Sequence, residues 1–190
     1  MDLDILINKA IRLGASDAKV IRTNGIIIEP HLVELCKPPG CQGYGKCANC
    51  PPHAMGPQEA RAMIESHTWA LLFKIDLPPE SLLSESHHRE FRKVFMISGA
   101  LEQAARQLGL ASPYGLGAGS CKVAFCNGVP CAQLQAKPCL YPKVARPSPE
   151  AIGINLFKLA SLVGWPIHRI GRDSDPKKIP SAMLMGMVIV

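Results

Sequence analysis

The chain has 190 residues, of which 47% are hydrophobic, and its formal net charge is +6. This length and apolar content are enough to bury the core of a single domain spanning residues 1–190. No apolar run reaches the roughly 20 residues of a membrane helix, and the first residues carry no basic stretch typical of a secretory signal. We therefore expect a soluble, cytoplasmic protein without membrane association.

The first elements expected along the chain are a helix and a β segment. Residues 3–13 place apolar side chains at helical spacing, which predicts a short amphipathic helix. Residues 18–29 are rich in β-branched side chains and predict a strand or hairpin, with Asn24-Gly25 as a two-residue turn. A second helix is predicted over 57–67, because it opens with Pro57 and has an acid in its first turn.

The rest of the chain continues this alternation of helix and strand. Residues 69–77 read as a buried strand, and 84–110 carry one apolar stripe that predicts the longest helix. The sequence Ser148-Pro149-Glu150 has the cap and first-turn residues of a further helix. The last strands are predicted over 165–170 and 182–190.

These elements predict an α/β or α+β fold, with a mixed sheet flanked by helices and two cysteine-rich metal loops. Residues 1–80 and 85–190 share a rough order of helix, cysteine loop, helix and strand. The segment 10–16 also resembles 105–112 in sequence. An internal duplication with one metal centre in each half is therefore a hypothesis, and halves that do not superpose would reject it.

All eight cysteines fall in two windows rich in glycine and proline, which lack the periodicity to order themselves. Successive cysteines are separated by four, five and two residues in the first window, and by four, four and seven in the second. Each window therefore predicts one four-thiolate metal centre. The ligands are Cys36, Cys41, Cys47 and Cys50 in the first window, and Cys121, Cys126, Cys131 and Cys139 in the second.

The spacing favours iron–sulfur clusters over zinc. Structural zinc sites usually join two close pairs of ligands, whereas this chain has one CxxC pair. Wider spacings between successive single cysteines suit a cuboidal cluster with four corners. We predict two [4Fe-4S] clusters. Two structural zinc ions are the main alternative, and redox-active or buried thiols are a further one.

The net charge of +6 does not by itself predict a nucleic-acid-binding protein. A four-thiolate centre with a divalent core contributes a charge of about −2. Two occupied centres would therefore remove most of the positive charge. No run of Lys or Arg is longer than two residues, so we expect no nucleic-acid partner.

Several short motifs follow one another in a definite order along the chain. They are 36–45, Cys50-Pro51-Pro52, Gly119-Ser120-Cys121-Lys122, Pro138-Cys139, 145–151 and Gly153-Ile154-Asn155. In these motifs the chain resembles a widespread family described as predicted metal-binding proteins. The resemblance covers nearly the whole chain and implies the fold and the cysteine ligands rather than a biochemical role. Many family members carry CxxC steps in the second window, whereas Val123-Ala124-Phe125 widens the first step here.

The leading functional hypothesis is an iron–sulfur protein that transfers electrons, or delivers or senses a cluster, for a partner enzyme. The alternative is a zinc-stabilised module that binds another protein. A third possibility is an enzyme whose cluster has an open iron position. No Ser-His-Asp arrangement, paired-carboxylate motif or HExxH motif appears, so no catalytic residue is predicted.

Other polar residues near the windows have simpler interpretations. His53, His87 and His88 are expected at the surface rather than on a metal. Lys122 and Arg146 flank the second window, where a solvated charge is slightly favoured over contact with a cluster or an anionic partner. Residues 115–119 are glycine-rich but lack the Lys-Ser/Thr of a P-loop, so they are expected to give the backbone room beside a metal.

Overall fold

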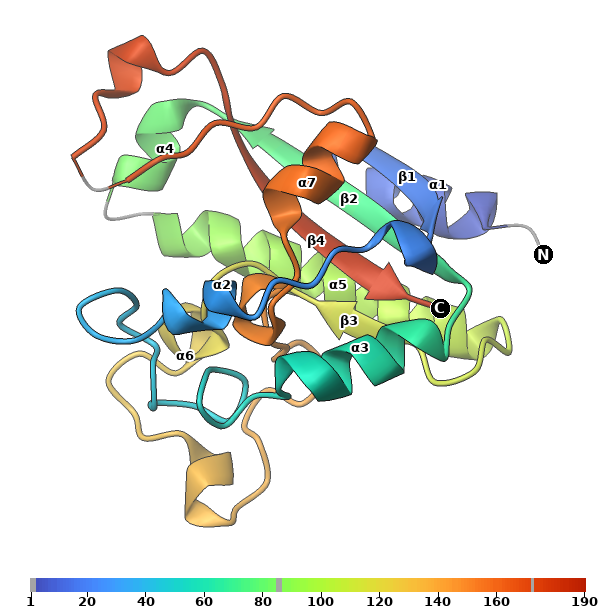
Figure 1. Ribbon diagram of the computed structural model, residues 1–190, viewed down its shortest axis with the longest axis horizontal. Coiled ribbons are helices and arrows are strands. Elements are labelled where there is room, and N and C mark those ends of the chain that lie inside the picture. Colours follow the sequence, from blue (N-terminus) through green and yellow to red (C-terminus); the bar gives the residue numbers. More distant parts are fainter. Residues whose placement is uncertain (1–2, 85–86, 172) are drawn as a thin grey trace.

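The computed structural model describes residues 3–84, 87–171 and 173–190, and its centre is a four-stranded antiparallel sheet (Figure 1). The strand order is β1-β2-β4-β3. The strands are β1 Asp17–Arg22, β2 Trp69–Leu77, β3 Tyr114–Leu116 and β4 Ala182–Ile189. The predicted class, a sheet flanked by helices, is confirmed.

The strand directions differ from the expected mixed sheet, because all three strand pairs are antiparallel. Arg22, the last residue of β1, pairs with Trp69, the first residue of β2. The long connection between these strands therefore returns to the end of the sheet that it left. That path makes the two strands antiparallel, whereas parallel neighbours need a connection that crosses to the opposite end.

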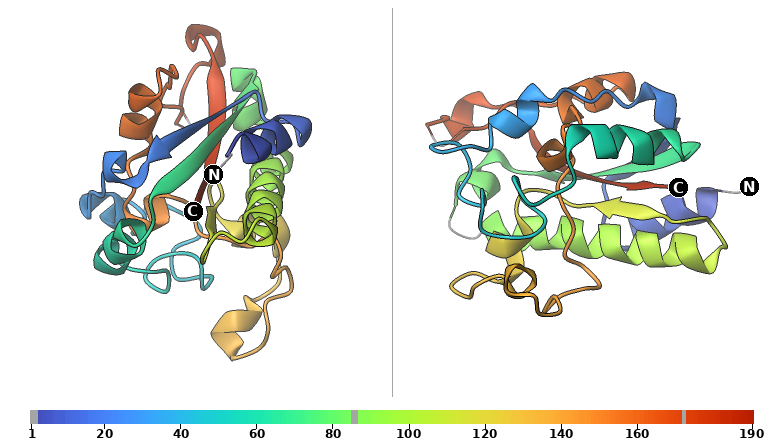
Figure 2. Two further views of the ribbon diagram at one scale, coloured as in Figure 1. Left: turned by 90° about the vertical axis from the view of Figure 1, so that its right-hand side faces the viewer. Right: turned by 60° about the horizontal axis from the view of Figure 1, so that its bottom comes forward.

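Helices cover both faces of the sheet (Figure 2). On one face, α1 (Asp4–Arg12) and α5 (His87–Gln107) pack on Leu71 and Phe73 of β2. On the other face, α3 (Pro57–Glu65) and α7 (Leu156–Leu162) share a core with Ala70 and Leu72. Successive side chains of β2 thus enter opposite cores, which is why its sequence is a nearly continuous apolar run.

The strongest periodic patterns are confirmed. The predicted helices at 3–13, 57–67 and 84–110 correspond to α1, α3 and α5, and α5 has 21 residues. The predicted strands at 69–77 and 182–190 correspond to β2 and β4. The remaining helical segments are short: α2 His31–Glu34, α4 Pro79–Leu83, α6 Cys121–Phe125, and the 3-10 turns η1 Thr23–Gly25, η2 Ala132–Gln135, η3 Glu150–Ile152 and η4 Pro176–Lys178.

Of the strand or hairpin predicted over 18–29, the strand is present as β1, and the hairpin is wrong. Asn24-Gly25 lies in the 3-10 turn η1, and β1 pairs with β2 instead of with the residues that follow the turn. Ile26 and Ile28 are buried in the core beneath α3 and α7, and Ile28 forms an isolated bridge with Ile154. Burial of these side chains in the core therefore outweighs the local turn signal.

Two predictions in the last third of the chain also need correction. Ser148 Oγ accepts from the Ala151 N–H beside a single 3-10 turn that ends at Gly153, where φ is +90°. The helix α7 begins only after its cap Asn155. Residues 165–170 form no strand, since Pro166 lacks an N–H donor. Trp165 is buried and donates from Nε1 to Asp17 Oδ2 at 2.8 Å.

The strand β3 lies within a segment that was expected to be a loop. The sequence of this segment does not predict a strand, because the segment is rich in glycine and glycine is a poor strand former. The space around it explains the glycines: a Cβ on Gly115 would lie 2.8 Å from Ser98 Oγ, and one on Gly117 would lie 2.2 Å from the Phe95 ring. The edge strand can therefore lie against α5 only if positions 115 and 117 carry no side chain.

The order of elements is compatible with the hypothesis of an internal duplication. Each half contributes a helix, a strand, a long cysteine-containing connection, a second helix and a second strand. The sheet order places β2 and β4 at the centre and β1 and β3 at the edges. Both the duplication and the single-domain assignment stay predictions. No helix in the part of the chain that the structure describes is long and apolar enough to cross a membrane.

We expect Gly99→Ala to destabilise the protein, although glycine-to-alanine changes at exposed helix positions usually stabilise by about 1 kcal/mol. Gly99 lies on α5, and a Cβ there would be 2.3 Å from the carbonyl oxygen of Lys143. The expected loss is about 1–3 kcal/mol in the free energy of unfolding, measured by urea denaturation. Gln103→Ala, at an exposed position of the same helix, is the control and should be nearly neutral. A Gly99→Ala variant as stable as the wild type would contradict this packing.

Candidate metal centre

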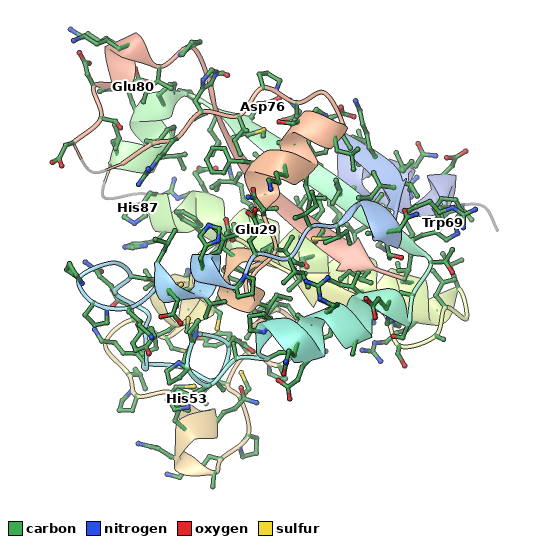
Figure 3. All side chains as sticks on the ribbon, in the orientation of Figure 1. Glu29, His53, Trp69, Asp76, Glu80 and His87 are labelled. Atoms are coloured by element: carbon green, nitrogen blue, oxygen red, sulfur yellow. The ribbon has the colours of Figure 1, made fainter. Side chains whose placement is uncertain are left out.

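Three buried cysteines from the two windows meet beside α5. Cys47 and Cys50 come from the first window and Cys121 from the second, and all three belong to one buried cluster with Phe95 of α5. The sulfur atoms of Cys47 and Cys121 are 3.9 Å apart, although 74 residues separate them in sequence. Cys50 Sγ lies 3.2 Å from Ser120 Oγ, beside Cys121. Figure 3 shows sulfur atoms in this part of the molecule, near the labelled His53.

A glycine allows the two windows to approach each other. Gly43 is buried, and a Cβ there would lie 2.8 Å from Ser120 Oγ and 3.1 Å from Cys50 Sγ. Any larger residue would push the first loop away from the second. The short helix α6 then begins directly at Cys121 and holds this sulfur at the junction of the loops.

The other three cysteines of the second window turn toward the same place. Cys126, Cys131 and Cys139 line a cavity of about 20 Å³ together with Cys47 and Cys121. Phe125 closes one side of this cavity and stacks on Tyr141, with ring centroids 5.2 Å apart. Five cysteines, one from the first window and four from the second, therefore line one small space.

The electrostatics favour a thiolate at Cys47. Hydrogen bonds from the thiols of Cys121 and Cys50 lower the pKa of Cys47 well below its ordinary value. The same hydrogen bonds, together with burial, raise the pKa of Cys50 and Cys121. Cys47 is thus the sulfur of the three that ionises most readily, and a bound cation would displace the protons of the other two.

The surrounding loops carry no opposing negative charge. Residues 35–56 and 103–149 contain no Asp or Glu, whereas Lys46, Lys122, Lys137 and Lys143 lie in them. Since thiolates are stabilised by nearby positive charge, this composition supports ionised cysteines. Lys122 itself donates to the carbonyl oxygen of Cys126 at 2.6 Å, so it fixes the loop rather than extending freely into solvent.

Several N–H groups point at sulfur. The Asn49 side-chain amide donates to Cys121 Sγ, the Gly43 backbone to Cys41 Sγ and the Tyr141 backbone to Cys139 Sγ, each at 3.4 Å. Such donors orient thiolate ligands and tune the metal that they hold. Asn49 was not recognised from the sequence, although its place inside the CxxC pair is a signal that could have identified it.

Cys36 and Cys41 lie apart from this group. Cys41 is exposed, and Cys36 is half-buried, with burial raising its pKa. The sulfurs therefore do not lie as two separate sets, one for each window, because Cys47 faces the cysteines of the second. Across residues 3–84, 87–171 and 173–190, no three Cys, His, Asp or Glu side chains are arranged around a single-ion position. Ligation by all eight cysteines stays a prediction.

Among the flanking residues, Arg146 has a structural partner. Its guanidinium donates to both carboxylate oxygens of Glu102, at 2.7 and 3.1 Å, and Glu102 also binds Arg106 and the backbone N–H of Gly115. Arg146 thus ties the end of the second loop to α5. His53 is exposed, as expected, and His87 and His88 are partly exposed in the wall of a cleft.

We expect Glu102→Gln to cost about 2 kcal/mol in the free energy of unfolding at pH 7, because it leaves Arg146 with little exposure and no countercharge. Burial alone would raise the pKa of Glu102, but the hydrogen bonds and charge of Arg146 hold it below the ordinary value. Its contribution is therefore present above the unfolded-state pKa of about 4.3 and is lost as the pH falls through the folded-state value. Urea denaturation at pH 7 and at lower pH measures the contribution of Glu102 to the free energy of unfolding. Glu65→Gln, on exposed α3 surface, is the control, and equal losses in both variants would refute the assignment.

The residues present fit a metal bound by thiolates. Buried sulfurs from both loops converge on one space, N–H groups donate to sulfur, and the loops carry no carboxylate. Together with the helix-covered antiparallel sheet, these features define a cysteine-rich metal-binding protein.

The chain belongs to the family described as predicted metal-binding protein (DUF2284), whose model matches residues 19–190. Comparisons with curated proteins and with solved structures give no match.

Proposed function

We propose that this protein is an iron–sulfur protein in which the two cysteine windows hold one cluster jointly. The supporting observation is the approach of Cys47 to Cys121, with the other three cysteines of the second window around the same cavity. Cys47 and Cys121 are the buried ligands of this centre. Cys126, Cys131 and Cys139 are the half-exposed candidates for the remaining positions.

The shape of the second loop supports a cluster larger than the present cavity. A space of about 20 Å³ holds about one water molecule, so a cuboidal cluster requires some sulfurs to move outward. The segment that carries Cys131 and Cys139 extends away from the sheet and its helices (Figure 1). Its movement would leave Cys47 and Cys121 in place against Phe95.

A second centre remains part of the proposal, formed by the other cysteines of the first window. Cys36 and Cys41 are close enough to influence each other's ionisation, and Cys50, which lies beside Ser120 at the joint centre, would have to turn toward them. If Cys47 belongs to the joint cluster, this second centre lacks a fourth cysteine of its own. It is then the place for a cluster with one open iron position, or for a ligand of another kind.

The surroundings of the joint centre support electron transfer, or cluster delivery, to a partner protein. Large apolar side chains are exposed in the second loop beside the cysteines, and lysines are the charged residues around them. A face of this kind suits a partner protein with acidic groups around an apolar patch. The exposed apolar residues are Val129, Leu134, Leu140 and Tyr141.

One observation favours structural zinc as the second candidate. In a tetrahedral Zn–S₄ site with Zn–S bonds of about 2.3 Å, neighbouring sulfurs lie about 3.8 Å apart. The distance between Cys47 and Cys121 is 3.9 Å. Zinc at this position would pin the loops together and provide no electron transfer.

Metal analysis of protein purified without oxygen separates the two candidates. The iron–sulfur proposal expects iron and acid-labile sulfide in equal amounts, visible sulfur-to-iron charge-transfer absorption, and a paramagnetic signal after reduction. Zinc in a colourless protein without labile sulfide would reject the iron–sulfur proposal and support structural zinc instead. Protein that contains no bound metal after such a preparation would reject both.

A further inference from the structure

A cleft of about 730 Å³ opens beside the cysteine loops. Its walls come from α4, the start of α5, α7 and the segment 167–170, and β4 contributes Met183–Met185. Small-molecule sites in proteins usually have volumes of about 300–1,000 Å³ and mostly apolar walls. The apolar side chains here include Leu82, Phe91 and Leu156.

The cleft continues toward the first cysteine window. A second hollow of about 220 Å³ shares Gln42, His87, His88 and Phe91 with the cleft and is also lined by Cys41. The exposed sulfur of Cys41 therefore lies at the end of a continuous depression that starts between α4 and α7. His87 is labelled in Figure 3, at the start of α5.

Two histidines in this wall differ in hydrogen bonding. His87 Nδ1 lies 2.6 Å from the carbonyl oxygen of Ser84, and since a carbonyl only accepts, Nδ1 carries the proton. Among the described residues, His88 Nδ1 is the one buried side-chain nitrogen or oxygen without a hydrogen-bond partner. Buried polar atoms are rarely left unpaired, so a partner from a bound molecule is the simplest explanation for His88.

The charges of the cleft suit an anion. Arg169 and His168 are exposed in the wall, and the described part of the chain provides no hydrogen bond or ion pair for either side chain. Glu150 is the one carboxyl group in the described lining. Burial raises the pKa of Glu150, which reduces its repulsion of a bound anion.

We infer that this cleft binds a small organic anion with an apolar body, whose carboxylate or phosphate is held by Arg169. The apolar body lies along β4 and α7, and the bound molecule reaches the two histidines beside Cys41. This site goes beyond the proposed iron–sulfur function and does not depend on which metal the cysteines hold. It supplies the chain with a substrate or effector site next to its first cysteine window.

A charge series of ten-carbon probes tests this inference. Isothermal titration with decanoate, decyl phosphate, decan-1-ol and decyltrimethylammonium would be carried out on the wild-type protein, with its metal content recorded. Decanoate or decyl phosphate should bind at least about tenfold more tightly than the alcohol, and the cation should bind most weakly. The tighter of the two anions identifies the head group as carboxylate or phosphate.

Two variants and a position readout complete the test. Arg169→Gln should weaken anion binding by about tenfold without lowering the thermal midpoint, since no residue in the described part of the chain pairs with the Arg169 side chain. Arg61→Gln, at an exposed position of α3, should leave the affinity unchanged. A diazirine analogue of the tighter anion should label peptides from α4, the start of α5 or 167–170. Equal affinity for alcohol and anion, an unchanged affinity in Arg169→Gln, or labelling elsewhere would overturn the inference, whatever metal is found.

Discussion

Cys121→Ser is expected to abolish metal binding at the joint centre. The Cys121 sulfur is buried, lies 3.9 Å from Cys47 and receives the Asn49 amide, so it is central to the group of sulfurs. Serine replaces a soft thiolate with a poor ligand for iron in a cluster or for zinc. The metal bound at this centre should fall by at least about tenfold, measured by elemental analysis and by visible absorption under oxygen-free conditions.

Cys41→Ser is the matched control for that experiment. Cys41 is exposed and lies away from the cavity between Cys47 and Cys121, so its loss should leave the joint centre intact and affect only a centre in the first window. Cys47→Ser should behave like Cys121→Ser, although Cys47 lies in the same window as Cys41. If Cys47→Ser and Cys41→Ser instead lose the same centre and Cys121→Ser retains it, the windows bind metal separately.

Removal of the metal is expected to expose the second loop to proteolysis. The segment 126–143 contains little regular structure beyond the 3-10 turn η2, and its half-buried cysteines face the body of the protein. Metal binding to such a loop contributes directly to its folding free energy. After anaerobic chelation, cleavage after Lys137 by lysyl endopeptidase, which accepts the following Pro138, should accelerate by at least about tenfold, because the loop then opens more often.

The segment that contains η4 provides an internal control for this proteolysis. Lys178 is highly exposed there and lies far along the chain from the cysteines, so its rate of cleavage should not depend on the metal. Lys74 in β2 should remain protected, since the strand lies inside the sheet. Equal acceleration at Lys178 and Lys137 would indicate global unfolding. An unchanged rate at Lys137 would mean that the loop is held by packing alone.

The sequence predicted those parts of the fold that local periodicity determines. The strand β2 and the helix α5 carry long apolar patterns of one period each, and both were located within a few residues. The edge strand β3 was missed, because Gly115 and Gly117 are required by contact with α5, which is distant in sequence. The hairpin at Asn24-Gly25 failed for a similar reason, since the burial of Ile26 and Ile28 depends on α3 and α7.

In the candidate metal centre too, contacts between segments distant in sequence could not be predicted from local patterns. Clustering in the sequence identified the cysteines as a group and the loops as their carriers. It could not show that Cys47 faces Cys121 instead of joining only its neighbours in the first window, because that approach depends on Gly43 lying against Ser120. Nor could it identify the cleft, whose walls come from several helices, the strand β4 and the segment 167–170, which meet only in the folded chain.

We propose that sulfurs from both windows bind one iron–sulfur cluster. Crystals grown without oxygen, with diffraction data collected on both sides of the iron absorption edge, test this proposal most directly. We expect an anomalous iron peak with several iron atoms, bonded to the sulfurs of both Cys47 and Cys121. Iron confined to cysteines of a single window, or a peak at the zinc edge alone, would contradict it.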